Sequence, residues 1–158
     1  MILAQNRSAH YKIIIAEDAA VPHIHAAEEL RSFLHQITGA HFQLYTEHEQ
    51  PKEVRPDHHL NALCPPEKQT YIYVGDTAFA KRLGYTVPRD LGKEGYSIRT
   101  DGDRLYIIGG ALRGVLYGVY SFLETYCECR WFTAEISRIP KRSALEILAI
   151  DDAQIPVL

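Results

Sequence analysis

Apolar and polar residues follow regular spacings along most of the chain, and these spacings predict the main elements. YKIIIA at 11–16 is a short β-branched run that predicts a buried strand, and TYIYVG at 70–75 predicts another. In VPHIHAAEELRSFLHQITG, apolar residues recur every three or four positions between Pro22 and Gly39, which predicts an amphipathic helix. HFQLY at 41–45 alternates as a strand does.

The clearest local pattern is EGYSIRTDGDRLYIIGG at 94–110. Two alternating runs flank an Asp-Gly turn, so the segment predicts a β-hairpin. GVLYGVYSFLE follows with an apolar stripe at helical spacing and predicts a second long helix. DTAFAKRLG predicts a short helix with Asp76 as N-cap and Gly84 as its end, and CRWF and LEILAI predict further strands.

The order of these elements mixes hairpins with crossovers. This order favours an α+β two-layer fold, with two main helices packed on one face of a mixed, largely antiparallel sheet, over a doubly wound parallel sheet. At 158 residues we expect one domain over 1–158. Residues 46–69 are rich in proline, charge and histidine, and are interpreted as a long surface excursion.

Glycines mark both the start and the interior of the second long helix. Gly109 and Gly110 precede it and raise the possibility of a phosphate cradle at a helix N-terminus. The spacing is G-G-x-x-x-G, however, whereas dinucleotide loops need G-x-G-x-x-G. A sharp turn from strand to helix is therefore the favoured interpretation.

Inside that helix, Gly114, Gly118, Ser121 and Thr125 fall on one side and form a ridge of small residues. A glycine in an exposed helix costs about 1 kcal/mol relative to alanine, so a solvated face explains the ridge poorly. We interpret the ridge as room for a close neighbour, which is either the first helix or a further domain. It is the candidate docking face of the molecule.

CRWF suggests a second candidate site. Arg130 and Trp131 could stack on and hydrogen-bond a sugar or a carboxylate. The competing interpretation is that Trp131, the only tryptophan, closes the edge of the core.

Metal chemistry has weaker support in the sequence. His23 and His25 lie near a helix start, with Glu28 or Glu29 at ligand-compatible spacing, and His58 and His59 lie in the excursion. Nothing in the sequence ties these groups together, so we expect no metal site and no cofactor. The three cysteines, Cys64, Cys127 and Cys129, form no disulfide framework and fit a reducing compartment.

Composition narrows the function classes. The chain is 46% hydrophobic and 23% charged with a net charge of −3, as in an ordinary globular protein. Because no basic run stands out, we expect no nucleic-acid partner, and no apolar stretch approaches the ~20 residues that cross a bilayer. The start of the chain lacks the pattern of a signal peptide, so a cytoplasmic location is expected unless a leader has been removed.

The quoted segments occur in an order that resembles a known family. HAAEELRSFLHQITGAHFQL, YIYVGDTAFAKRLG, the hairpin and its helix, CRWF and AIDDAQIPVL together resemble the N-terminal α/β domain that precedes the catalytic barrel in α-glucuronidases, β-hexosaminidases and related glycoside hydrolases. The resemblance covers nearly all of the chain outside 46–69, and RG-x-x-YG-x-x-x-FLE is among its most specific parts. YCECRW departs from the family pattern, which leaves the conformation around Cys127 and Cys129 open.

The resemblance implies a non-catalytic accessory domain of a carbohydrate-active enzyme. Such a domain docks on and stabilises a downstream barrel of the same polypeptide, with its two long helices toward the barrel and 151–158 leading into it. The family's catalytic carboxylates belong to the barrel, so no catalytic residue is assigned in this chain.

Two other functions remain open at this point. One is an independent carbohydrate-binding module that uses Arg130, Trp131 and exposed tyrosines such as Tyr71, Tyr73 or Tyr120. The other is a small stand-alone enzyme that holds a phosphate at the Gly109–Gly110 turn.

Overall fold

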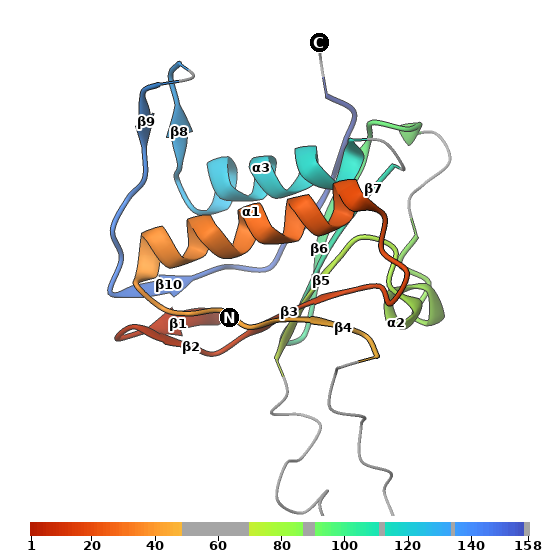
Figure 1. Cartoon of the computed structure of the whole chain (residues 1–158), viewed down its shortest axis with the longest axis horizontal. Helices are drawn as coiled ribbons and strands as arrows, with labels where there is room; N and C mark the ends of the chain where they lie inside the picture. Colours follow the sequence, from red (N-terminus) through yellow and green to blue (C-terminus); the bar gives the residue numbers. More distant parts are fainter. Residues whose placement is uncertain (49–69, 87–90, 111–112, 134, 157–158) are drawn as a thin grey trace, which may run out of the picture.

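A six-stranded sheet forms the centre of the computed structural model, which describes residues 1–48, 70–86, 91–110, 113–133 and 135–156 (Figure 1). Its strand order is β11-β6-β7-β5-β3-β4. The strands are β3 (Lys12–Ile15), β4 (Leu44–Thr46), β5 (Tyr71–Val74), β6 (Tyr96–Asp101), β7 (Arg104–Gly109) and β11 (Asp151–Gln154). The expected strands at 11–16 and 70–75 and the hairpin at 94–110 are confirmed, and Gly102 in the hairpin turn has φ +57°.

The sheet is mixed. Strand β3 pairs in parallel with β4 and β5, and β5 pairs in parallel with β7, whereas β6 pairs antiparallel with β7 and β11. Two smaller antiparallel sheets join β10 (Ala144–Glu146), β1 (Ile2–Gln5) and β2 (Ser8–Ala9), and β8 (Arg130–Trp131) with β9 (Ser137–Arg138). The predicted α+β architecture is confirmed, with a parallel centre that the hairpin-rich order did not indicate.

Two long helices cover one face of the sheet. Helix α1 (Val21–Thr38) and helix α3 (Gly114–Tyr126) pack against each other and against the strands below them (Figure 1). Gly39, at φ +72°, ends α1 in the left-handed conformation that glycine adopts without steric cost. None of the described helices combines the length and apolar character needed to cross a membrane.

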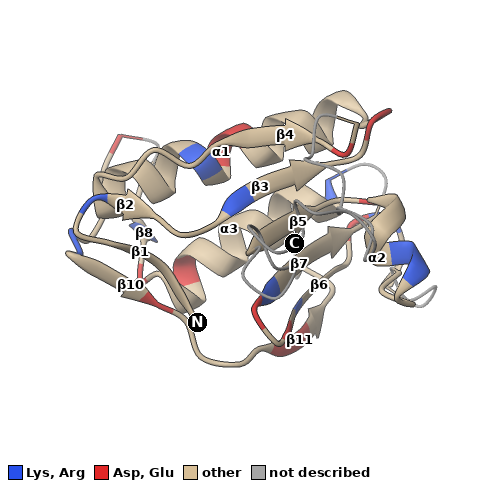
Figure 2. Cartoon of the chain, turned by 90° about the horizontal axis from the view of Figure 1, so that it is seen from below, with Lys and Arg blue, Asp and Glu red and all other residues tan. Residues whose placement is uncertain are grey.

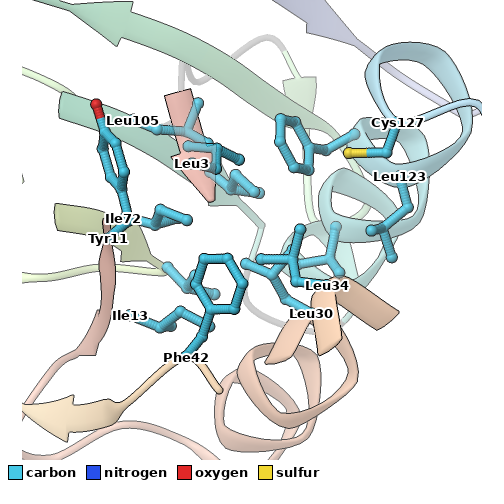
Figure 3. Close-up of a cluster of buried hydrophobic side chains, with 14 of the residues drawn as sticks. Leu3, Tyr11, Ile13, Leu30, Leu34, Phe42, Ile72, Leu105, Leu123 and Cys127 are labelled. Carbon is cyan, nitrogen blue, oxygen red and sulfur yellow. The ribbon is translucent and has the colours of Figure 1, made fainter. Parts of the chain in front are cut away.

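The main core lies between this face and the two helices. The strands contribute apolar side chains at alternate positions, and the helices contribute one apolar stripe each (Figure 3). Each large aliphatic or aromatic side chain buried here contributes about 1.5–3 kcal/mol relative to an exposed one. Fully buried members include Ile13, Leu30, Leu34, Ile72, Leu105, Phe122 and Leu123.

The opposite face of the sheet carries a second cluster, built from aromatic rings. The ring of Tyr73 stacks on Phe79 at 4.9 Å and on Tyr106 at 5.2 Å. Phe79 belongs to α2 (Ala78–Arg82), the short helix that covers part of this face. The N-cap of α2 is Thr77, whose hydroxyl accepts from the Ala80 N–H, so the prediction of Asp76 as N-cap is wrong by one residue.

Candidate functional site

Gly109 and Gly110 lie where strand β7 turns towards helix α3. A Cβ atom on Gly109 would lie 2.1 Å from the Gly114 carbonyl carbon, and one on Gly110 would lie 2.2 Å from the Lys93 carbonyl oxygen. The Gly110 N–H donates to the Gly95 carbonyl at 2.9 Å. Close backbone packing therefore explains both glycines, and the carbonyl oxygens beside Gly110 oppose an anion.

The first half of the small-residue ridge faces the chain's own hairpin. A Cβ atom on Gly114 would lie 2.3 Å from the Gly95 carbonyl oxygen. On Gly118 it would lie 2.9 Å from Ile107 Cγ2 and 3.2 Å from Tyr96 Cβ. The nearest neighbour of Gly114 and Gly118 is thus the β6–β7 hairpin. A docking role for this ridge stays a prediction.

The second half of the ridge lies towards strand β11. Ser121 Oγ lies 2.9 Å from the Tyr96 hydroxyl, which also lies 3.2 Å from Gln154 Oε1. Thr125, one helical turn further on, is exposed. Ser121 is therefore engaged within the domain, and Thr125 is the one ridge residue whose side chain is open to a partner.

An apolar hollow of about 580 Å³ opens beside these elements, between the N-terminal ends of α1 and α3. Val21, Pro22 and Leu116 supply its apolar lining, and Val21 is 78% exposed. His25, Glu94 and Arg113 complete the lining. A side-chain hydrogen bond with Tyr117 raises the pKa of Arg113, the cation at the rim.

Helix α1 begins at this hollow with no side-chain N-cap. Its N-cap position is Ala20, and Pro22 stands in the first turn, where the missing N–H removes no helical hydrogen bond. The apolar spacing in the sequence predicts this helix start but not the hollow, because Leu116 and Val21 are nearly 100 residues apart. The apolar residue Val21 at the start of the helix is the sequence feature that could have indicated the hollow.

The last described strand reaches the same end of the molecule. Gln154 pairs with Tyr96, and Tyr96 pairs with Gly109, so β11 leaves the sheet where β7 turns towards α3. Tyr96 is only two residues from Glu94 of the hollow. Figure 1 shows β11 passing behind α3 towards the end at which both long helices begin.

Trp131 lies in an aromatic cluster that joins α1, α3 and β8. Its ring centroid is 5.5 Å from that of Phe33 and 5.2 Å from that of Tyr120, both in edge-to-face geometry. The Tyr120 hydroxyl donates to Glu29 at 2.7 Å, and burial together with this hydrogen bond raises the pKa of Tyr120 to about 12. Trp131 thus packs on the edge of the core.

Arg130 hydrogen-bonds to backbone carbonyl groups at and just beyond the end of helix α3. Its Nη1 donates to the Glu124 carbonyl at 2.7 Å and to the Cys129 carbonyl at 2.8 Å. Sugar binding by Arg130 and Trp131 stays a prediction. The expectation that Tyr71 and Tyr73 are exposed is wrong, because both are buried in the aromatic cluster on the second face of the sheet.

The candidate metal ligands are dispersed among the described residues. His23 is buried, His25 lines the apolar hollow, Glu28 is exposed and Glu29 holds Tyr120. No group of three or more histidine, cysteine or acidic side chains that could hold a metal ion occurs among the described residues. Cys64, His58 and His59 lie outside them.

The two described cysteines are buried and unpaired. Burial raises the pKa of the Cys127 thiol, and it raises that of Cys129 to about 11. Figure 3 shows the Cys127 sulfur directed towards the core cluster. The segment left open by the sequence is thus a tight turn, in which Glu128 has φ +62° between two buried thiols.

The sequence matches the family model described as Glycosyl hydrolase family 67 N-terminus over residues 3–122. The chain therefore belongs to this family of glycoside hydrolase N-terminal domains. No curated protein matches the sequence.

One solved structure shares the fold, and a second gives a weaker match. The first is a novel family GH115 4-O-methyl-α-glucuronidase with specificity for decorated arabinogalactans. Its sequence identity is 13% and the TM-score is 0.56, and the match covers 98% of this chain and 18% of the glucuronidase chain. The second is a GH138 enzyme targeting pectin rhamnogalacturonan II, with 16% sequence identity and a TM-score of 0.45. That match covers 75% of this chain and 13% of the GH138 chain. The chain thus spans less than a fifth of the length of these enzymes.

Proposed function

We propose that this chain is a non-catalytic N-terminal accessory domain of a glycoside hydrolase, which docks on and stabilises a catalytic barrel that follows in the same polypeptide. Its membership of a family of hydrolase N-terminal domains supports this. The GH115 α-glucuronidase supports it further, because nearly all of this chain matches only 18% of that enzyme.

The observation that carries the proposal is the position of the apolar hollow. Val21, Pro22 and Leu116 expose apolar surface at the end of the molecule where strand β11 leaves the sheet. Exposed apolar surface with a polar rim is typical of protein interfaces. A domain following β11 would start beside this surface and could cover it without a long linker.

The chemistry of the hollow supports a docking role over a catalytic one. Hydrolysis of a glycosidic bond uses two carboxyl groups on opposite sides of the bond. Among the described lining residues Glu94 is the sole carboxylate. The carbohydrate-binding alternative gains nothing from Trp131, because its ring packs against Phe33 and Tyr120.

Complementation between separately produced domains tests the proposal. The 158-residue chain and the downstream barrel are mixed, and their association is measured by calorimetry together with the thermal stability of the barrel. Val21→Asp should weaken association by about tenfold, because it places a charge in an apolar contact. Leu83→Asp is the matched control, since Leu83 is 45% exposed and lies outside the hollow.

Catalysis by this chain is tested separately. The chain alone should not hydrolyse aryl glycosides, whereas the polypeptide with its barrel should. Turnover by the isolated chain would refute the non-catalytic role. Equal association of the two aspartate variants would instead refute the hollow as the docking surface.

A further inference from the structure

Three adjoining hollows surround the C-terminal end of helix α1. Their volumes are about 910, 510 and 380 Å³. His35 lines the first and second, His41 the second and third, and Arg7 the first and third, so the hollows form one continuous surface. It lies at the opposite end of α1 from the apolar hollow.

The charged side chains among the described residues of this surface are all basic. None of the described lining residues is aspartate or glutamate, although the chain as a whole carries a net charge of −3. In Figure 2 basic segments mark the turn beside β2, the start of β3 and the middle of α1. We call this surface the basic belt, after its lysines and arginines Arg7, Lys12, Arg31, Lys141 and Arg142.

Most of the positive charge of the belt is not neutralised by the residues that the structure describes. Arg142 forms an ion pair with Glu128. Arg7, Lys12 and Arg31 have no carboxylate within ion-pair distance among the described residues. A concave surface of one sign concentrates counter-ions, so this surface attracts an anion.

Backbone carbonyl groups at the end of α1 lie beside the largest of the three hollows. A helix C-terminus normally presents free carbonyl oxygens, which repel negative charge. At the end of α1 two of these oxygens have partners: Lys141 Nζ donates to the Gln36 carbonyl at 2.7 Å and the Arg142 N–H to the Ile37 carbonyl at 2.8 Å. These two hydrogen bonds reduce the repulsion that the helix end would exert on an anion.

Local packing holds the middle of the belt in place. His35 Nδ1 donates to the Ala40 carbonyl at 2.9 Å, and the His35 and His41 rings stack at 4.5 Å. The Arg7 stem lies over Gly39, where a Cβ atom would be 3.2 Å from Arg7 Cγ. Gly39 thus makes room for the arginine that two of the hollows share.

We propose that the basic belt binds an acidic oligosaccharide, one whose sugar rings carry carboxylates. Arginine guanidinium groups match carboxylates in geometry, and Arg7 and Arg31 stand in different hollows, so successive sugars could each meet one. The choice of a sugar ligand rests on the proposed function in a glycoside hydrolase.

Titration of the 158-residue chain with an oligogalacturonate and with its carboxyl-reduced, neutral counterpart tests this inference. Calorimetry should detect the acidic form only, and binding should weaken between about 20 mM and about 0.5 M salt as the charges become screened. Arg7→Gln and Arg31→Gln should each weaken binding about threefold or more. Arg82→Gln, the same charge change outside the belt, should leave it unchanged.

The result that would overturn the inference is no binding, equal binding of the neutral sugar, or equal loss with Arg82→Gln. Tighter binding of a single-stranded oligonucleotide would replace the sugar by a nucleic acid. Circular dichroism of each variant confirms that it is folded. The test is independent of docking, because it uses neither the barrel nor the apolar hollow, so either proposal can fail alone.

Discussion

The imidazole of His23 lies against the backbone of Gly75, so closely that a Cβ atom on Gly75 would be 2.8 Å from His23 Nδ1. The contact joins the first turn of α1 to the end of strand β5. Gly75 also has φ +84°, where side chains other than glycine are strained.

Gly75→Ala should therefore lower the free energy of unfolding by about 2–3 kcal/mol, from backbone strain and overpacking together. Gly84→Ala is the matched control, because Gly84 has φ +80° and no atom within 4 Å of its Cβ position. It should cost only the strain, about 1 kcal/mol. Equal losses in urea unfolding would show that the His23 contact adds nothing.

His23 should make stability depend on pH. Burial lowers its pKa from the ordinary value of 6.5, and nearby Asp76 only partly offsets this shift. The unfolded chain then binds the proton more readily, so this contribution is complete above pH 6.5 and is lost as pH falls from there through the folded-state pKa. Urea unfolding from about pH 7.5 to 5 should show a steeper decline for the wild type than for His23→Gln, and parallel declines would contradict the assignment.

Alanine substitutions of the α3 glycines test the packing of this helix, because a gain and a loss of stability have opposite meanings. If Gly114 and Gly118 were exposed docking positions, alanine would raise the stability of the isolated chain by about 1 kcal/mol each through helix propensity. Because they face the hairpin, we expect both alanine variants to be less stable. Gly114→Ala should lose more, since it meets the Gly95 carbonyl whereas Gly118→Ala meets side chains. Thermal unfolding measures both, and a gain in either would contradict the packing described.

Tyr96 should couple strand β11 to helix α3. Tyr96→Phe removes the hydroxyl shared by Ser121 and Gln154 and should cost about 1 kcal/mol. A double-mutant cycle with Ser121→Ala isolates the pair, and a coupling energy near zero would mean that the hydroxyl acts through Gln154 alone. Hydrogen exchange of the β11 amides should accelerate in Tyr96→Phe.

The buried cysteines should resist modification while the chain is folded. Burial raises the pKa of Cys129 to about 11 and that of Cys127 further, so the reactive thiolate is scarce at neutral pH. In a Cys64→Ser chain, thiol reagents at about pH 8 should react at the rate of unfolding and much faster in urea. Rapid labelling of the native chain would contradict the burial.

Local patterns predicted the elements whose stabilising contacts are local. The Asp-Gly hairpin, the apolar stripes of α1 and α3 and the β-branched run at 11–16 are of this kind. Strand β11 was missed because DDAQ carries no apolar alternation. It is held by backbone pairing with β6 and by the Arg99–Asp151 ion pair at 3.1 Å, across some 50 residues.

The candidate sites were harder to predict for the same reason. Helical periodicity placed Gly114 and Gly118 on one side of α3 but could not say which strands lie beneath that side. The basic belt has no counterpart in any run of sequence, because Arg7, Arg31 and Lys141 come from three distant segments. Only the fold brings them to one end of α1.

The exit of β11 beside the apolar hollow has a consequence for how strong docking needs to be. A partner attached directly after β11 would be held at an effective concentration in the millimolar range or above, as for any short tether. An interface too weak to hold two separate molecules together would then stay closed within one polypeptide. Modest apolar surface around Val21 and Leu116 is sufficient under that condition, and the linkage itself supplies the remainder of the affinity.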